Sequence, residues 1–309
     1  MSGAGCQDGA VTAAAPRVGI VLRTKNRPVF LARAVRDVLA QSFADWHLVV
    51  ANDGGDAAQV RSALAPFEQQ LAGRLTVLDV VAPNGRCAAA NQGLRAVDAG
   101  YVVLHDDDDS WHPEFLATTV EHLDAHPEHG GVMVPIEIVY EKQRGAEWVE
   151  TGREPLWPGL KQITLFDMLQ INRAVPISFL YRRALHDEVG FYDETLEAVE
   201  DWEFYLRVLV AGEIGFIAGR ILAYWSLRPA SRGHEGNSMY ALGDIHERYD
   251  TLVRDRALRL YIRDHGLGVP LMVAGLIERQ TAQQTKLLRA GGPITRVLRR
   301  VRDRVTGRG

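Results

Sequence analysis

Short apolar runs alternate with amphipathic segments through the first two-thirds of the chain, and this alternation limits the possible folds more than any other feature. The runs have the length and composition of buried strands, and they lie at residues 17–22, 47–51, 75–81 and 101–104. Pro28 stands where the first turn of a helix accepts a proline. Strands that alternate with helices over short connections form a mainly parallel sheet. We therefore predict an α/β fold with a Rossmann-like, mainly parallel sheet flanked by helices.

The chain divides into three parts by pattern. Residues 1–15 are rich in glycine and alanine and have no basic start, which predicts a disordered tail rather than a signal peptide. Residues 16–240 carry the strands and helices, whereas residues 241–309 predict a helical C-terminal extension. In the middle part we expect helices at 28–39, 57–71, 87–99, 116–123 and 200–211, β-rich sequence at 131–140 and 146–150, a loop-and-helix insertion at 153–176 and a strand at 177–181.

Composition excludes several classes of protein. The net charge of −4 over 309 residues argues against a nucleic-acid-binding protein. Two cysteines, Cys6 and Cys87, are too few and too far apart for a disulfide framework or a zinc site built on them. No run of about 18 apolar residues is present to span a bilayer. These features predict a cytoplasmic protein.

Four consecutive aspartates, at positions 106–109, directly follow the apolar run at 101–104. The carboxyl ends of strands are where open α/β sheets bind their ligands. Adjacent carboxylates repel one another unless a cation or solvent compensates, and Mg²⁺ or Mn²⁺ usually takes one or two carboxylates together with substrate phosphates. The run therefore predicts metal or phosphate chemistry, and a solvated acidic turn that caps the next helix is the alternative.

Further polar segments lie beside predicted strand ends and helix starts. Each of them suits a ligand, and each is also explained by a turn or a helix cap. They are Arg23-Thr24-Lys25-Asn26-Arg27-Pro28 at the end of the first strand, Asp53 in a glycine turn after the second, Asn84-Gly85-Arg86 before the helix that carries Asn91, Glu200-Asp201 at a helix start, and His234 in a glycine-flanked loop.

Taken together and in this order, these segments resemble the inverting family-2 glycosyltransferases of the GT-A fold, over residues 16–240. The aspartate run and the pair Glu200-Asp201 are the specific part of the resemblance, and the segment at 189–194 supports it. The resemblance implies a nucleotide-sugar half at about 16–110 and an acceptor half at about 111–240.

The resemblance also implies roles for single residues. Asp201 would be the general base, supported by Glu200, and Trp202 and Trp157 would lie on the acceptor side. The metal would be held by Asp108 and Asp106, with His234 as a further candidate. The implied donor contacts are Thr24, Asn26, Arg27, Asp53, Asn84, Arg86, Asn91, Asp106 and Asp107. The chain departs from the common pattern of the family at Asn52 and Gly55 around Asp53, at Ala90 and at His105.

The expected activity is metal-dependent transfer of a sugar, with Mn²⁺ or Mg²⁺, from a nucleoside-diphosphate sugar to a hydroxyl of a glycan or lipid-linked acceptor in bacterial surface polysaccharide synthesis. A UDP-sugar is the first choice of donor, and dTDP- and GDP-sugars are alternatives. A sugar nucleotidyltransferase would need a glycine-rich phosphate loop, which residues 23–28 lack. A binding or scaffold protein that has lost catalysis would lack acids of the aspartate run or of the pair Glu200-Asp201, and both are intact here. A dehalogenase-like phosphatase would carry its Asp-X-Asp motif on the first strand of its core.

The C-terminal segment is strongly basic. Between Lys286 and Arg308 it has eight basic residues and one acidic residue. At 293–305 the aliphatic residues follow helical spacing, which predicts a basic amphipathic helix on the cytoplasmic face of an anionic membrane. The alternatives are a helix that packs on the acidic catalytic domain and a frayed terminus.

Overall fold

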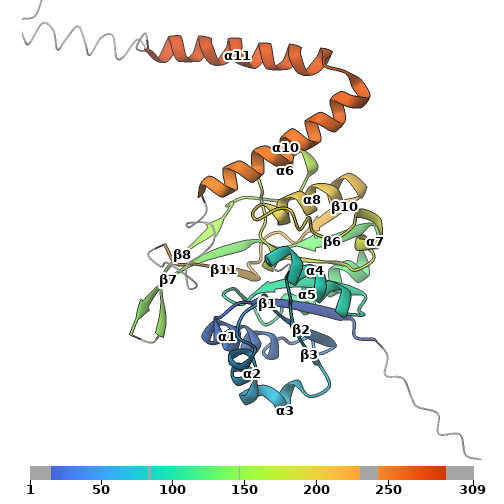
Figure 1. Cartoon of the computed structure of the whole chain (residues 1–309), viewed down its shortest axis with the longest axis vertical. Coiled ribbons are helices and arrows are strands. Elements are labelled where there is room, and N and C mark those ends of the chain that lie inside the picture. Colours follow the sequence, from blue (N-terminus) through green and yellow to red (C-terminus); the bar gives the residue numbers. More distant parts are fainter. Residues whose placement is uncertain (1–14, 83–84, 146, 230–242, 290–309) are drawn as a thin grey trace, which may run out of the picture. The chain divides into compact units, whose positions relative to one another are not determined.

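The computed structural model describes residues 15–82, 85–145, 147–229 and 243–289. It forms two compact units, residues 1–250 and residues 251–309 (Figure 1). The predicted helix at 293–305, the predicted tail apart from Ala15, and the site candidates Asn84 and His234 lie outside the described residues.

The first unit is built on a seven-stranded sheet in the order β10-β6-β9-β4-β1-β2-β3. Its strands are β1 (Val18–Thr24), β2 (Trp46–Asn52), β3 (Leu75–Asp79), β4 (Tyr101–Asp106), β6 (His129–Met133), β9 (Phe179–Arg182) and β10 (Glu213–Phe216). Only β9 runs antiparallel to its neighbours, β4 and β6. The predicted α/β fold with a mainly parallel sheet is therefore confirmed.

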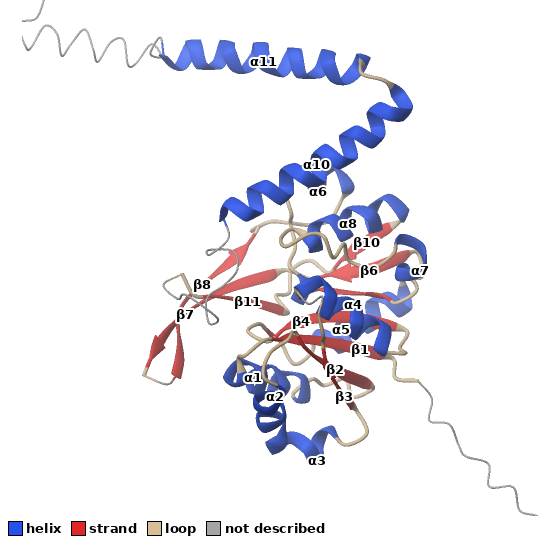
Figure 2. Cartoon of the chain, viewed as in Figure 1, coloured by secondary structure: helices blue, strands red, loops and turns tan. Residues whose placement is uncertain are grey.

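Helices flank this sheet (Figure 2). Side chains along β1 point alternately to its two faces, and each face packs against a helix. Val18, Ile20 and Leu22 belong to the core that also contains the apolar face of α1. On the other face of the sheet, a Cβ at Gly19 of β1 would collide with Val97, and a Cβ at Gly93 of α4 would collide with Val21 of β1. Helix α4 therefore lies close against β1. The helices of this unit are α1 (Pro28–Leu39), α2 (Ala57–Leu64), α3 (Glu68–Leu71), α4 (Arg86–Ala96), α5 (Phe115–Ala125), α6 (Leu165–Gln170), α7 (Leu185–Val189) and α8 (Glu200–Ala211).

A smaller sheet, in the order β5-β11-β7-β8, joins the first. Its strands are β5 (Ser110–Trp111), β7 (Ile136–Arg144), β8 (Glu147–Leu156) and β11 (Ala223–Leu227). Strand β8 runs into the segment predicted as loop and helix, because it pairs with β7 from Arg144 back to Ile136. The structure divides the single helix expected at 57–71 into α2 and α3. The 3₁₀ turn η1 (Ala65–Phe67), which contains Pro66, lies between them. The expected strand at 177–181 begins as the 3₁₀ turn η2 (Pro176–Ser178) before β9.

The helices α10 (Gly243–His265) and α11 (Gly268–Arg289) occupy the region predicted to be helical. Gly266 separates them with a φ of 76°, which suits glycine. Among the described residues, no helix combines the length and apolar character needed to cross a membrane.

Candidate functional site

The aspartate run lies at the carboxyl edge of the large sheet, where β1, β2 and β4 end. The parallel register places Thr24 beside Asn52 and Arg23 beside Asp106. The polar residues that follow each strand are therefore neighbours in space. The four aspartates differ in their surroundings, although Asp107 and Asp108 share Arg27 as a partner.

Asp106 is joined to the start of α8 through one arginine. The Arg23 guanidinium donates to Asp106 from Nε at 2.8 Å and from Nη2 at 2.9 Å. Its Nη1 lies 3.8 Å from Glu200 Oε1. Burial disfavours the charge of Arg23, but Asp106 and Glu200 outweigh this and raise its pKa. A permanently charged arginine thus connects the two acidic segments that the sequence singled out.

Asp107 points into the protein. Its side chain is fully buried, and it accepts a hydrogen bond from Thr24 Oγ1 at 2.7 Å. Arg27 Nη2 lies 2.5 Å from Asp107 Oδ1. Burial raises the pKa of Asp107 to about 7, although Arg27 opposes the shift. Asp107, Thr24 and Arg27 therefore form a buried support beneath the edge of the sheet.

Asp108 is held between two arginines. Arg228, which is fully buried at the end of β11, pairs with both Asp108 and Glu141. Arg27 Nη1 also donates to Asp108 Oδ2, at 3.2 Å. Burial alone would raise the pKa of Asp108, but Arg27 and Arg228 outweigh it and hold the pKa below its usual range. Asp108 is therefore a stable anion.

Asp109 closes the turn that begins at Asp106. Its backbone N–H donates to Asp106 O at 3.1 Å, and its Oδ1 accepts from Ser226 N at 3.0 Å. Burial, and then repulsion from Asp108 and Asp106, raises its pKa well above the usual range. Asp109 thus anchors β11 of the small sheet to the aspartate run.

The carboxylates fit a hard divalent cation. Such ions prefer oxygen ligands and bind through one or two carboxylates plus phosphate oxygens. The side chain of Asp106 is 25% exposed and that of Asp108 is 10% exposed, whereas that of Asp107 is wholly buried. Asp106 is therefore the most exposed member of the run, and the carboxylate of Asp108 has little exposed surface and pairs with Arg27 and Arg228.

A second strand-end loop contains Asp53. Its Oδ1 accepts from Gly85 N at 2.6 Å, and Lys25 Nζ lies 3.5 Å from its Oδ2. Gly55 is required here, because a Cβ at this position would lie 2.7 Å from Asn52 Oδ1 and 2.9 Å from Asn26 N. Asn26 has a φ of 54°, and its Oδ1 accepts from the backbone of residue 56 at 2.8 Å. The loops after β1 and β2 are thus bound tightly together.

The pair Glu200-Asp201 opens α8 under local strain. Val199, which precedes it, has a φ of 58°, a region that β-branched residues rarely occupy. Asn172 Nδ2 donates to Asp201 Oδ2 at 3.0 Å. Burial, and then the charge of Glu200, raises the pKa of Asp201 to about 6. A carboxylate with this pKa can accept a proton near neutral pH.

The two tryptophans predicted on the acceptor side lie in different surroundings. Trp202 is 2% exposed, and its indole N–H donates to Met168 O, so its ring has no face open to a sugar. Trp157 lines a cavity of about 430 Å³, with the Arg173 guanidinium 4.4 Å above its ring. Of these two tryptophans, Trp157 is the one that lines a cavity.

Two further predicted donor contacts, Asn91 and Arg86, bind other residues of the chain. Asn91 is 1% exposed, and it donates to Tyr192 O and Glu194 Oε1 at 2.9 and 2.8 Å. Arg86 Nη2 donates to Glu200 Oε2 at 3.3 Å. Asn91 thus positions the segment before α8, and Arg86 is the residue of α4 that reaches the acidic pair.

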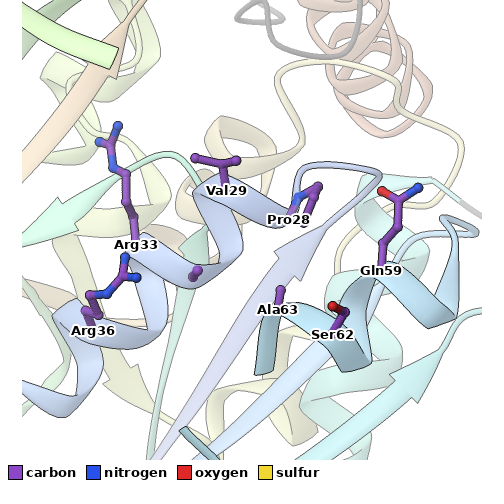
Figure 3. A pocket seen from close by; sticks show the side chains of 8 residues that line it. Pro28, Val29, Arg33, Arg36, Gln59, Ser62 and Ala63 are labelled. Carbon is purple, nitrogen blue, oxygen red and sulfur yellow. The ribbon is translucent and has the colours of Figure 1, made fainter. Parts of the chain in front are cut away.

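Another hollow, of about 420 Å³, lies between α1 and α2. Figure 3 shows Arg33 and Arg36 extending from α1, and Gln59 and Ser62 on α2. Arg33 pairs with Glu141 at 2.8 Å. The hollow contains none of the aspartates, so it is not the candidate active site.

The sequence analysis did not assign Arg228 or Asn172 to this site, and it named Arg23 as part of a basic segment without its acidic partners. Arg23 and Arg228 lie 83 and 120 positions from the aspartates that they bind, and Asn172 lies 29 positions from Asp201. An arginine directly after the apolar strand at 223–227 was the available signal for Arg228. The local pattern held no signal for Asn172.

Comparison with known proteins identifies similar chains. The model of the family described as glycosyl transferase family 2 matches residues 19–190. The uncharacterized glycosyltransferase YwdF of Bacillus subtilis is 30% identical over 195 residues, which cover 62% of this chain and 67% of that protein. The putative colanic acid biosynthesis glycosyl transferase WcaA of Escherichia coli is 22% identical over 63% of this chain and 67% of its own length. The succinoglycan biosynthesis protein ExoU of Rhizobium meliloti is 29% identical over 65% of this chain and 60% of its own length.

Solved structures share the fold. TarS of S. aureus in complex with UDP-GlcNAc matches with a TM-score of 0.57 and 16% identity, covering 82% of this chain and 75% of that chain. The mannosyltransferase PcManGT of Pyrobaculum calidifontis, in complex with GDP-Man and Mn²⁺, matches with a TM-score of 0.53 and 16% identity, covering 91% and 80%. At these identities the likeness shows the fold alone.

Proposed function

Because the chain belongs to glycosyl transferase family 2, we propose that this enzyme moves a sugar from a nucleoside-diphosphate sugar to an acceptor hydroxyl with inversion. The observation that carries the proposal is the bridge from Asp106 through Arg23 to Glu200. The bridge joins Asp106 to Glu200, the neighbour of the candidate base Asp201, and this supports a shared donor and acceptor site at the carboxyl edge of the sheet. That edge is where an α/β sheet binds its ligand.

The donor side consists of Asp106 and Asp108, above the support formed by Asp107, Thr24 and Arg27. Asp106 and Asp108 would hold Mn²⁺ or Mg²⁺, which neutralises the charge of a leaving nucleoside diphosphate. The loop of Asp53 and Asn26 would face the base of the nucleotide.

On the acceptor side, Asp201 is the proposed general base. Its Oδ2 is oriented by Asn172, and its pKa of about 6 keeps it deprotonated at pH 7. It would accept the proton of the attacking hydroxyl, and the oxygen would then attack the anomeric carbon from the face opposite the diphosphate. Glu200 would support it through Arg23 and Arg86. Trp157 and its cavity are the proposed contact for an acceptor sugar.

The biological setting is proposed from the relatives. The names of WcaA and ExoU place those proteins in colanic acid and succinoglycan biosynthesis. We extend this to a glycan or lipid-linked acceptor of a bacterial surface polysaccharide, in the cytoplasm. A UDP-sugar is the first donor to test, with GDP- and dTDP-sugars as alternatives.

The test is a calorimetric titration of UDP-, GDP- and dTDP-sugars with and without Mn²⁺, followed by transfer assays with the donor that binds. Metal-dependent binding of one donor is expected, and Asp108→Ala should weaken it strongly because the ion loses a protein ligand. Asp45→Ala, a change on the segment before β2, serves as the matched control. Equal donor binding by wild type and Asp108→Ala, with unchanged transfer, would show that the metal assignment is wrong.

A further inference from the structure

Three histidines and a glutamate meet where α5 ends and β6 begins. His122 lies in the last turn of α5, His126 caps it, and His129 is the first residue of β6. His126 Nδ1 lies 3.0 Å from Glu128 Oε1, and His129 Nε2 lies 3.9 Å from the same oxygen. One ligand atom from each of His126, Glu128 and His129 lies within 4.8 Å of the other two. We propose that these three side chains bind a divalent transition-metal ion of the Zn²⁺ class.

The spacing suits such an ion. Zn²⁺ binds nitrogen and oxygen ligands at about 2.0–2.2 Å in a tetrahedron, so neighbouring ligand atoms are about 3.4 Å apart. The three side chains need only small rotations to reach this arrangement. Two histidines, one glutamate and a water molecule form an established set of zinc ligands. The side chains of His126 and Glu128 are 45% and 56% exposed, so an ion and a water molecule can reach them from solvent.

A fourth side chain orients one of the ligands. His122 Nε2 lies 3.0 Å from His129 Nδ1, and the two rings stack with centroids 5.2 Å apart. A histidine bound to a metal through one ring nitrogen nearly always hydrogen-bonds through the other. The rings of His122 and His129 can lie against residue 215 because this residue is glycine. A Cβ at this position would lie 2.5 Å from His122 Nε2. His122 is therefore a positioning residue for His129.

The backbone around the ligands is already held in place. Arg182 on β9 donates to Leu123 O at 2.7 Å, to His126 O at 3.2 Å and to His129 O at 3.0 Å. One guanidinium thus binds carbonyls on both sides of the turn. The ligands belong to a rigid turn, which lowers the entropic cost of binding an ion.

This site is distinct from the aspartate run in place and in chemistry. Strands β4 and β6 both run antiparallel to β9, so they are parallel to each other. The aspartates follow the carboxyl end of β4, whereas His129 is at the amino end of β6, at the opposite edge of the sheet. Imidazole ligands favour Zn²⁺, Ni²⁺ or Cu²⁺, whereas an all-oxygen set favours Mg²⁺ or Mn²⁺.

The test uses the full chain without a histidine tag, stripped with a chelator and titrated with Zn²⁺ in a calorimeter. We expect one site at the turn. His126→Ala and Glu128→Gln alter exposed side chains, and each should lower the Zn²⁺ affinity on the order of 100-fold or more, since even the loss of an outer partner costs about 10- to 100-fold. His122→Phe retains a stacking ring but loses the hydrogen bond, and it should lower the affinity about 10- to 100-fold.

Two controls separate this site from others. His112→Ala removes a partly exposed histidine elsewhere on the chain, and Asp98→Asn removes an exposed carboxylate outside both sites. Both should keep the wild-type Zn²⁺ affinity. The absorption bands of Co²⁺ bound in place of Zn²⁺ should indicate four ligands in the wild type and change in His126→Ala. Absence of Zn²⁺ binding by the wild-type chain, or equal affinity in His126→Ala, Glu128→Gln and wild type, would refute the site.

Discussion

At the scale of the residue, the environment of Asp201 decides when it can accept a proton. Burial and Glu200 raise its pKa to about 6, so the transfer rate should rise with pH through about 6 and then level off. Asp201→Asn keeps the hydrogen-bonding shape but cannot take the proton, and it should lower transfer by about 100- to 10,000-fold. Rates of both proteins measured from pH 5 to 8 check this.

The raised pKa of Asp201 also predicts how the stability of the protein depends on pH. The folded protein binds this proton more tightly than the unfolded chain, so the contribution of Asp201 to the free energy of unfolding falls as pH rises from 3.8 through about 6. Asp201→Asn should remove that part of the pH dependence. Asp98→Asn, an exposed change, is the control for both measurements. Near wild-type transfer by a folded Asp201→Asn would reassign the base to Glu200.

At the scale of the element, the approach of α4 to β1 positions Arg86 and Asn91. A Cβ at Gly93 would lie 2.3 Å from Val21 Cγ1. Gly93→Ala should therefore push the helix away from the sheet and lower the free energy of unfolding by about 1–3 kcal/mol. Urea denaturation measures the change. Gly212→Ala is the control, because nothing lies within 4 Å of its Cβ, and it should stay within about 0.5 kcal/mol of wild type.

At the scale of the whole molecule, the basic C-terminal segment predicts attachment to anionic membranes. Each basic residue near such a surface contributes about 1 kcal/mol, and this attraction weakens as salt screens it. The full chain should sediment with anionic vesicles at low salt, and a chain truncated after Ala290 should sediment less. Neutral vesicles are the control. Equal sedimentation of both chains with anionic vesicles would contradict the prediction.

The amino-acid sequence by itself determined the fold class and the family, and it indicated the segments of the candidate site. These follow from short-range patterns, because the period of apolar residues distinguishes strands from helices and the strand ends show where ligands bind. The aspartate run and the pair Glu200-Asp201 were therefore identifiable from sequence alone, although their roles remain predictions.

Only the tertiary structure decided which residues meet. Arg23 and Arg228 bind aspartates far along the chain because strand register and the joining of two sheets bring them there. Trp202 is buried rather than open, since α8 packs against α6 and its indole bonds to Met168. The spacing of His122, His126 and His129 is visible in the sequence, but their convergence depends on the turn that Arg182 holds. Periodicity specifies local structure, whereas contacts between distant residues depend on how the elements pack.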